Sequence, residues 1–277
     1  MTTTFTTSDN LEEFAEQLQP GIDADLTLQD VEYADGLWIG TFRDDGLSST
    51  WNYNDDLEGL ELQIEERWEQ GYELTDVEYG DGTWFATFEE GFSSDSSYIY
   101  NSDFDTFTGR IDELADGGLY RGQDLIDVEY GDGIWFATFT DELDSSTYAV
   151  SPDVDSLSAD IDSIQEQDYD IVDVEYTDDG WTSVFYEAIA IDTTYTISTT
   201  QEEFEQDITE KLDQGYDVMD LEYGDGVWVT VFDGTLGSTD TNSDSTDSNS
   251  NIATDMVIDN MILENSHYAF DPDHWMI

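Results

Sequence analysis

One short pattern occurs five times along the chain and constrains its fold more than any other feature. Each copy has an Asp, an aliphatic residue and a Glu, and a Trp follows six residues after the Glu. The five Glu residues are spaced by 46, 51, 46 and 47 residues. A period this regular is typical of repeat proteins, in which copies of one supersecondary unit bury each other's apolar faces.

The second copy, residues 76–88, predicts a β-hairpin with Asp81-Gly82 at its tip. Apolar and polar residues alternate on both sides of this dipeptide, and Asp-Gly suits a two-residue turn that needs positive φ at both positions. The pairs expected across the hairpin are Tyr79 with Trp84, Val77 with Ala86 and Glu78 with Phe85. Three other copies place an Asp at the same tip: Asp35, Asp132 and Asp225. Turn chemistry explains these tips, and the fourth copy departs by reading Thr-Asp-Asp-Gly at 177–180.

The two faces of this hairpin differ in chemistry, because side chains alternate across a strand. One face is predicted to be the core: Val77, Tyr79, Trp84, Ala86 and Phe88. The other face carries a carboxylate pair beside two further residues: Asp76, Glu78, Phe85 and Thr87.

A helix is expected before each hairpin and a strand before each helix. Leu57, Leu60, Ile64 and Trp68 recur at helical spacing, and Gly71 suits the helix end. Short Thr- and Tyr-rich stretches precede the helices and favour strands: 3–6, 49–53, 97–100, 147–150 and 194–198. The repeating unit is therefore strand–helix–strand–strand, with approximate bounds of 1–46, 47–93, 94–143, 144–190 and 191–235.

The predicted fold class is α+β, with five βαββ repeats over 1–235 closed as a five-fold α/β propeller. An open stack would need polar capping repeats, and neither the first nor the fifth unit looks like one. An open solenoid and a conventional β-propeller remain as alternatives.

The chain changes character after the repeats. Residues 236–251 form a polar linker, and 252–277 form an apolar tail that holds both histidines, His267 and His274. This tail predicts docking onto a second copy, and hence a homo-oligomer. Folding back onto its own repeats and service as an export signal are the alternatives.

The charge is extreme, with 69 acidic residues against five basic ones and a net charge of −64. Such a surface repels nucleic acid and anionic membranes, so neither is expected as a partner. No apolar run is long enough to insert into a membrane. High salt or divalent cations would neutralise the carboxylates, so we expect a secreted or cell-surface protein in a calcium-bearing medium. The alternative is the cytoplasm of a halophile.

The paired carboxylates are the strongest candidate site, because hard divalent cations need several oxygen ligands. The predicted calcium ligands are Asp30, Glu32, Asp76, Glu78, Asp127, Glu129, Asp173, Glu175, Asp220 and Glu222. The competing interpretation is a solvated sheet face, since the sequence has no EF-hand loop.

No enzyme activity is expected. The sequence has no Cys, and both histidines stand in the tail, so no thiol nucleophile or core histidine base is present. The function predicted from these features is a structural protein that assembles into an extracellular filament or surface layer, with calcium bridging acidic faces. The alternative is a monomeric acidic binding or scaffold module.

The second unit resembles a known repeat. Its helix ends in Trp-Glu-Gln-Gly-Tyr at 68–72, and the last strand is entered at Gly-Thr-Trp, 82–84. This resembles the repeats C-terminal to the kinase domain in plant casein-kinase-related kinases, over residues 1–232. The resemblance implies an α/β repeat fold and attaches no chemistry to it. Since this chain has no kinase domain, a signalling role does not carry over.

Overall fold

The computed structural model describes residues 3–34, 36–44, 46–90, 96–115, 123–140, 145–177, 180–187 and 193–234. The chain divides into a unit of Met1–Thr239 and a remainder, Asp240–Ile277. The predicted linker and tail, 236–277, lie outside the described residues.

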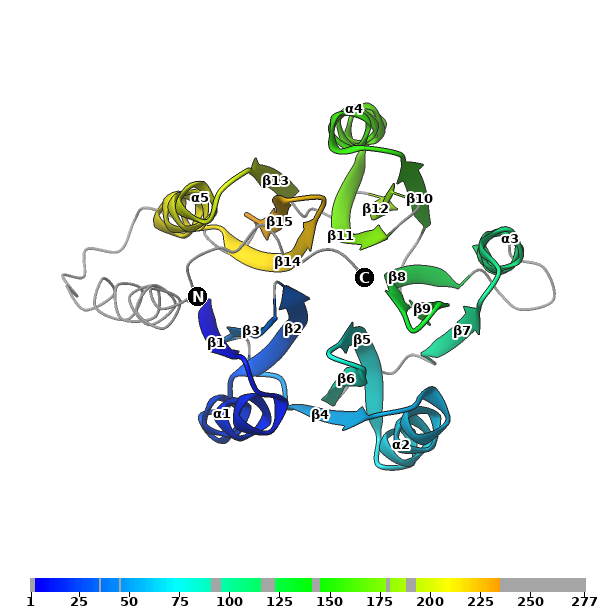
Figure 1. The fold of residues 1–277 in the computed structure, drawn as a ribbon, viewed down its shortest axis with the longest axis vertical. Coiled ribbons are helices and arrows are strands. Elements are labelled where there is room, and N and C mark those ends of the chain that lie inside the picture. Colours follow the sequence, from blue (N-terminus) through cyan, green and yellow to red (C-terminus); the bar gives the residue numbers. More distant parts are fainter. Residues whose placement is uncertain are drawn as a thin grey trace, which may run out of the picture. The chain divides into compact units, whose positions relative to one another are not determined.

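The elements follow the predicted order of strand, helix, strand, strand in each of the five repeats (Figure 1). The first unit contains β1 (Thr4–Ser8), α1 (Leu11–Asp23), β2 (Thr27–Ala34) and β3 (Leu37–Arg43). The second contains β4 (Ser49–Asn54), α2 (Leu57–Glu69), β5 (Tyr72–Gly80) and β6 (Thr83–Glu90). The third contains β7 (Ser97–Asn101), α3 (Phe104–Ala115), β8 (Asp124–Gly131) and β9 (Ile134–Thr140). The fourth contains β10 (Ser146–Ser151), α4 (Val154–Gln165), β11 (Tyr169–Thr177) and β12 (Gly180–Glu187). The fifth contains β13 (Thr193–Ser198), α5 (Gln201–Gln214), β14 (Asp217–Gly224) and β15 (Val227–Asp233).

Each unit has its own three-stranded antiparallel sheet, with the last strand of the unit in the middle. In the second unit, β6 lies between β4 and β5, and the same order holds in the other four. Because β4 and β5 both run antiparallel to β6, they are parallel to each other. Parallel strands need a crossover, and the helix of the unit supplies it.

The predicted hairpin register is confirmed in the second unit. Tyr79 pairs with Trp84, Val77 with Ala86 and Glu78 with Phe85. At the tip, Asp81 has φ 46° and Gly82 has φ 80°, as a two-residue turn with positive φ at both positions requires. Two other tips have the same geometry, Asp132-Gly133 and Asp225-Gly226. Asp35, and the departing Asp178 and Asp179 of the fourth copy, lie outside the described residues.

The helices begin and end where local chemistry satisfies their backbone groups. Asp56 caps α2, and its Oδ1 accepts from the Gly59 backbone N–H over 2.7 Å. Thr200 caps α5 in the same way, through the Glu203 N–H over 3.2 Å. At the other end of α5, Gly215 takes φ 90°, the left-handed conformation that Gly adopts without strain.

One face of each sheet packs against the helix of its own unit. In the second unit, α2 buries Leu60 and Ile64 against Val77, Trp84 and Phe88 of the sheet. These are the core residues that the sequence predicts for this face. The burial of a full helix face is the main stabilisation available to a unit this small.

The second face of the sheet is also buried, because it packs against the preceding unit. Phe85 is fully buried, and its ring lies 5.9 Å from the rings of both Phe14 and Trp38 in the first unit. Phe136 of the third unit joins the core of the second unit in the same way. The aromatic residues on the face that carries the carboxylate pairs therefore lie in the interior between units.

A tyrosine of one unit packs on a glycine of the next. A Cβ added to Gly80 would lie 2.2 Å from Cγ of Tyr33, and one added to Gly131 would lie 2.1 Å from Cγ of Tyr79. Gly224 meets Tyr176 similarly, at 1.9 Å. The first Gly of the Gly-Asp-Gly tip is thus needed for close approach between units, whereas the second Gly is needed for the turn.

The strands that carry the paired carboxylates lie innermost, and the helices lie outermost (Figure 1). Consecutive inner strands contact one another, in the order β2, β5, β8, β11, β14, and β14 also contacts β2. The first and fifth units are further joined at Thr3, whose hydroxyl donates to Asp217 Oδ1 over 2.9 Å. Thr3 Oγ1 also accepts from the Val218 N–H over 3.4 Å. No helix in the described ranges is long and apolar enough to cross a membrane.

Candidate functional site

The paired carboxylates of all five units lie on the inner strands β2, β5, β8, β11 and β14. We call the first member of each pair an inner aspartate: Asp30, Asp76, Asp127, Asp173 and Asp220. We call the second an inner glutamate: Glu32, Glu78, Glu129, Glu175 and Glu222. The spacing of the repeat, rather than any local motif, brings these ten groups together.

A β-bulge in each inner strand sets the direction of the aspartate. In β5, Leu74 pairs with Phe88 and Asp76 with Thr87, so Thr75 is the extra residue between them. The bulge puts Leu74 in the core and Asp76 on the opposite face, although residues two apart normally share a face. The same shift precedes the inner aspartate in the other four units.

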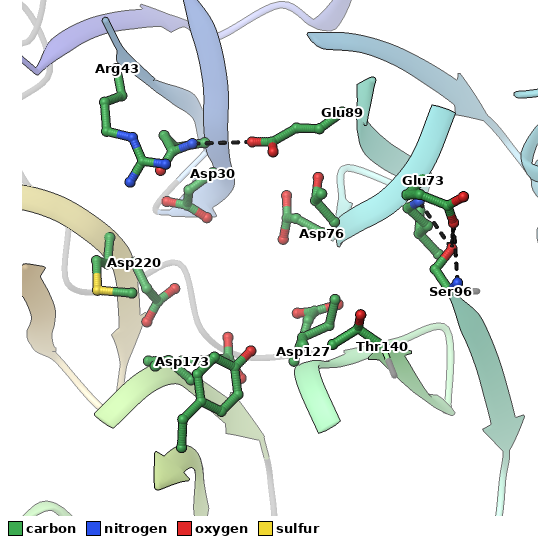
Figure 2. A pocket seen from close by; sticks show the side chains of 17 residues that line it. Asp30, Arg43, Glu73, Asp76, Glu89, Ser96, Asp127, Thr140, Asp173 and Asp220 are labelled. Carbon is green, nitrogen blue, oxygen red and sulfur yellow. Dashed lines mark hydrogen bonds between the residues drawn. The ribbon is translucent and has the colours of Figure 1, made fainter. Parts of the chain in front are cut away.

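The inner aspartates line a cavity of about 300 Å³. Figure 2 shows them arriving from all five units and pointing into one shared space. Asp30 and Asp127 are 7% and 6% exposed, and the other three are partly buried. A cavity of this size is at the lower end of the range for small-molecule sites.

The inner aspartates are only partly satisfied by hydrogen bonds. Asp220 Oδ2 accepts from the Val174 backbone N–H of the preceding unit over 3.0 Å, and the Thr138 hydroxyl donates to Asp127 Oδ2 over 3.3 Å. Three buried oxygens of the inner aspartates, however, have no hydrogen-bond partner in the described part of the chain: Oδ2 of Asp30, Asp76 and Asp173. Burying a carboxylate oxygen without a hydrogen-bond donor costs free energy. These three oxygens therefore gain the most from contact with a cationic ligand.

The inner glutamates bind the backbone of the unit before them. Oε1 of Glu78 accepts from the Tyr33 N–H over 3.1 Å, and Oε1 of Glu129 accepts from the Tyr79 N–H over 3.2 Å. Glu175 accepts from Tyr130 over 3.1 Å. The glutamates therefore join consecutive units, while the aspartates face the cavity.

Burial raises the pKa of all ten carboxyls, and repulsion from charged neighbours raises it further in all of them except Asp76. Burial raises the pKa of Asp76 to about 7, although hydrogen bonds from the Val31 and Val77 backbone and from Thr87 oppose this. Burial, followed by repulsion from Asp76, raises the pKa of Glu78 and of Asp220 to about 8. The pKa of every other member is raised well above its usual value, first by burial and then by charged neighbours. With pKa values of about 7 to 8, Asp76, Glu78 and Asp220 bind protons at neutral pH more readily than exposed carboxyls do.

Direct metal coordination is not evident in this geometry. Among the described residues, no three Asp, Glu or His side chains form a group that could hold a metal ion. Calcium needs six to eight oxygens at roughly 2.3–2.6 Å. The calcium site expected from the sequence thus stays a prediction, and a cation in this cavity would keep much of its water shell.

The remaining sequence candidates have structural roles or lie outside the described residues. Asp81, Asp132 and Asp225 are turn residues with positive φ. Trp38, Trp84, Trp135 and Trp181 are buried in the cores. His267 and His274 fall outside the described part of the chain.

Two positions of the repeat line the cavity and were missed from the sequence. One is the bulge residue: Gln29, Thr75, Ile126, Val172 and Met219. The other is near the end of the last strand, where four of the five units contribute: Arg43, Glu89, Thr140 and Tyr186. A search for identities among repeats passes over both positions, because each unit has a different residue there. That difference, set against five identical aspartates, is the signal by which they could be found.

No protein-family model matches the chain, and no curated protein matches it either. The resemblance to the repeats of plant casein-kinase-related kinases therefore stays a prediction.

Proposed function

We propose that the five units close into a five-fold α/β propeller and that this propeller is a binding module for a cationic ligand. The contact of β14 with β2 and the hydrogen bond from Thr3 to Asp217 support closure, since both join the first unit to the fifth. In an open solenoid each unit contacts only its neighbours, so the first and fifth units would not touch.

One observation carries the binding function. Buried oxygens of Asp30, Asp76 and Asp173 face a shared cavity without a hydrogen-bond donor among the described residues. A cation with about seven waters occupies roughly 200 Å³, at ~30 Å³ for each water. A cavity of about 300 Å³ accommodates that. Calcium, the cation expected from the sequence, is our first candidate among the inorganic ions.

We propose a binding role rather than catalysis. Among the described residues that line the cavity, all five inner aspartates have raised pKa values, whereas a hydrolase of the glycosidase type needs two carboxyls in different environments. Instead, a cation that binds displaces protons from the ten carboxyls, and the resulting negative charge holds the cation.

The direct test is a calorimetric titration of the full chain with calcium at fixed ionic strength. Asp76→Asn and Asp220→Asn remove one charge each from the cavity and keep the side-chain shape. We expect them to weaken binding about ten-fold, in line with the loss of one charge at short range. Asp55→Asn is the matched control, because Asp55 is exposed and distant in sequence from the inner strands. Equal binding by all four proteins would refute the cavity as the site.

The net charge of the whole chain also bears on the environment in which the protein works. A net charge of −64 opposes compaction, so folding is expected to need millimolar calcium or molar salt. Stabilisation by calcium at low ionic strength supports a secreted or cell-surface protein. Stabilisation by molar potassium alone supports the halophile cytoplasm.

Self-assembly into a filament or surface layer is the second candidate function. It is favoured by the apolar segment 252–263 in the sequence, which a polar linker separates from the repeats. An extended segment that adds to a partner's sheet edge makes a head-to-tail contact, and such contacts generate filaments. Light scattering in calcium should show assembly for the full chain and a monomer for a truncation after Asp233. If both stay monomeric, this second function is excluded.

A further inference from the structure

The wall of the cavity does not follow the five-fold repeat, although its aspartates do. The bulge residues and the last-strand residues of the first two units are polar: Gln29, Arg43, Thr75 and Glu89. Those of the third to fifth units comprise three apolar side chains, Ile126, Val172 and Met219, and two that carry a hydroxyl, Thr140 and Tyr186. We call the part of the wall formed by Ile126, Val172 and Met219 the apolar half of the cavity.

An inorganic ion gains no binding free energy from contact with the apolar half. Hydrocarbon surface in a binding cavity is favourable only when the ligand covers it with hydrocarbon of its own. Spherical cations also gain most from carboxylates that converge on one point, and no such group of three exists among the described residues. The inner aspartates are instead distributed around the space (Figure 2).

We propose that the ligand of this cavity is a linear aliphatic polyamine, with its ammonium groups on the inner aspartates and its methylene segments on the apolar half. This inference rests on the proposed function of the cavity as a cation site. Each ammonium carries three donors, which match the unpartnered oxygens of Asp76 and Asp173, on the units away from Arg43. Separate charges along a chain suit carboxylates that are spread out rather than convergent.

The position of Arg43 sets an orientation for the chain. Among the described residues that line the cavity, Arg43 is the one with a basic side chain, and it lies beside Asp30 (Figure 2). Its charge repels ammonium groups from the first unit and favours the side of Asp127 and Asp173. That side is also the apolar half, since Ile126 and Val172 directly precede these aspartates.

The experiment compares spermidine, butylamine and calcium on the full chain by calorimetry at one ionic strength. We expect spermidine to bind at least about ten-fold more tightly than butylamine, because it offers several charges and more methylenes. Ile126→Thr should weaken spermidine by about three- to ten-fold and calcium by less, because only the polyamine uses the apolar wall. Val150→Thr is the control, since Val150 is 40% exposed on β10 and does not line the cavity.

Failure of this inference is distinguishable from failure of the cation site. If calcium binds and Asp76→Asn weakens it, while spermidine binds no better than butylamine, the polyamine is wrong and the cation site stands. If Ile126→Thr weakens calcium and spermidine equally, the apolar half has no selective role and the inference is also wrong. If none of the three ligands binds, both proposals are refuted. Thermal unfolding of each variant without ligand shows whether a loss of binding is only a loss of fold.

Discussion

The backbone N–H of Tyr33 donates to Glu78 Oε1 over 3.1 Å, and the ring of the same Tyr33 fills the space that a Cβ on Gly80 would need. One residue of the first unit thus fixes both a carboxylate and a turn of the second. The same contacts recur between the second and third units, through Tyr79, Glu129 and Gly131. The positions of the inner glutamates Glu78 and Glu129 therefore depend on the packing between units.

Replacing Gly80 by Ala should destabilise the protein by about 1–3 kcal/mol, because the added methyl overlaps the Tyr33 ring. Ala itself is no worse than Gly in a strand, so a loss must come from the contact. Gly109→Ala is the control: it lies in α3, has nothing within 4 Å of an added Cβ, and should raise stability by up to about 1 kcal/mol. Urea denaturation measures both. If the two variants shift in the same direction, the close approach between units is not important.

Replacing Thr3 by Val should cost about 1–3 kcal/mol, because it leaves the buried Asp217 without the Thr3 hydroxyl. Thr6→Val, in the strand β1 that follows Thr3, should have little effect. The comparison tests the junction of the first and fifth units by thermal unfolding. Equal effects of the two variants would contradict a closed propeller.

The raised pKa values predict that stability falls as pH rises from about 5 to 8. A carboxyl whose pKa is raised in the folded state stabilises that state fully below its unfolded pKa of about 4, and this stabilisation is lost as pH passes its folded pKa. For Asp76, Glu78 and Asp220 the folded values are about 7 to 8. Each additional bound proton gives a slope of about 1.4 kcal/mol per pH unit in the free energy of unfolding.

Capping carboxylates act in the opposite direction but in a different pH range. Hydrogen bonds from Thr106 and from Ser156 hold the pKa of Asp103 and of Asp153 below the usual value. Protonation of these two carboxylates destabilises the protein only as pH falls below about 4.

Asp76→Asn should flatten the slope of the free energy of unfolding between pH 5 and 8 and raise stability at pH 8, whereas Asp55→Asn should leave the slope unchanged. A stability that increases toward pH 8 without added cations would be inconsistent with these buried carboxyls.

Ligand binding should release protons, because a cation favours the charged form of the inner carboxyls. Calorimetric titrations at pH 7 in two buffers of different ionisation enthalpy measure the number released. We expect a positive number for calcium or spermidine and an affinity that rises from pH 6 to pH 8. Binding without proton release would place the cation on exposed carboxylates instead.

The sequence predicts the repeating unit well, because its signals are local. The Asp81-Gly82 turn determines the hairpin register, and the spacing of Leu57, Leu60 and Ile64 determines the buried face of α2. What the sequence does not predict is how units meet. Phe85 stands among polar residues on its face, and its burial depends on Phe14 and Trp38 some 50 to 70 residues earlier.

The site is predicted in part for the same reason. Five identical Asp and Glu pairs are visible as a pattern, so the inner carboxylates could be named in advance. The bulge at Thr75 could not, because it is a property of strand pairing that no residue type requires. Alternation from the hairpin tip predicts the face of Asp76, but the burial of Leu74 in the core and the position of the wall residue Ile126 depend on the bulge.

Whether the inner aspartates hold a cation can be seen directly in a crystal soaked in barium or strontium. Both ions substitute for calcium and scatter anomalously. If the inner aspartates hold a cation, we expect an anomalous peak in the cavity among Asp30, Asp76, Asp127, Asp173 and Asp220. Asp76→Asn crystals should show that peak weakened, with the surface peaks unchanged. Peaks confined to exposed carboxylates, with none in the cavity, would contradict cation binding by the inner aspartates.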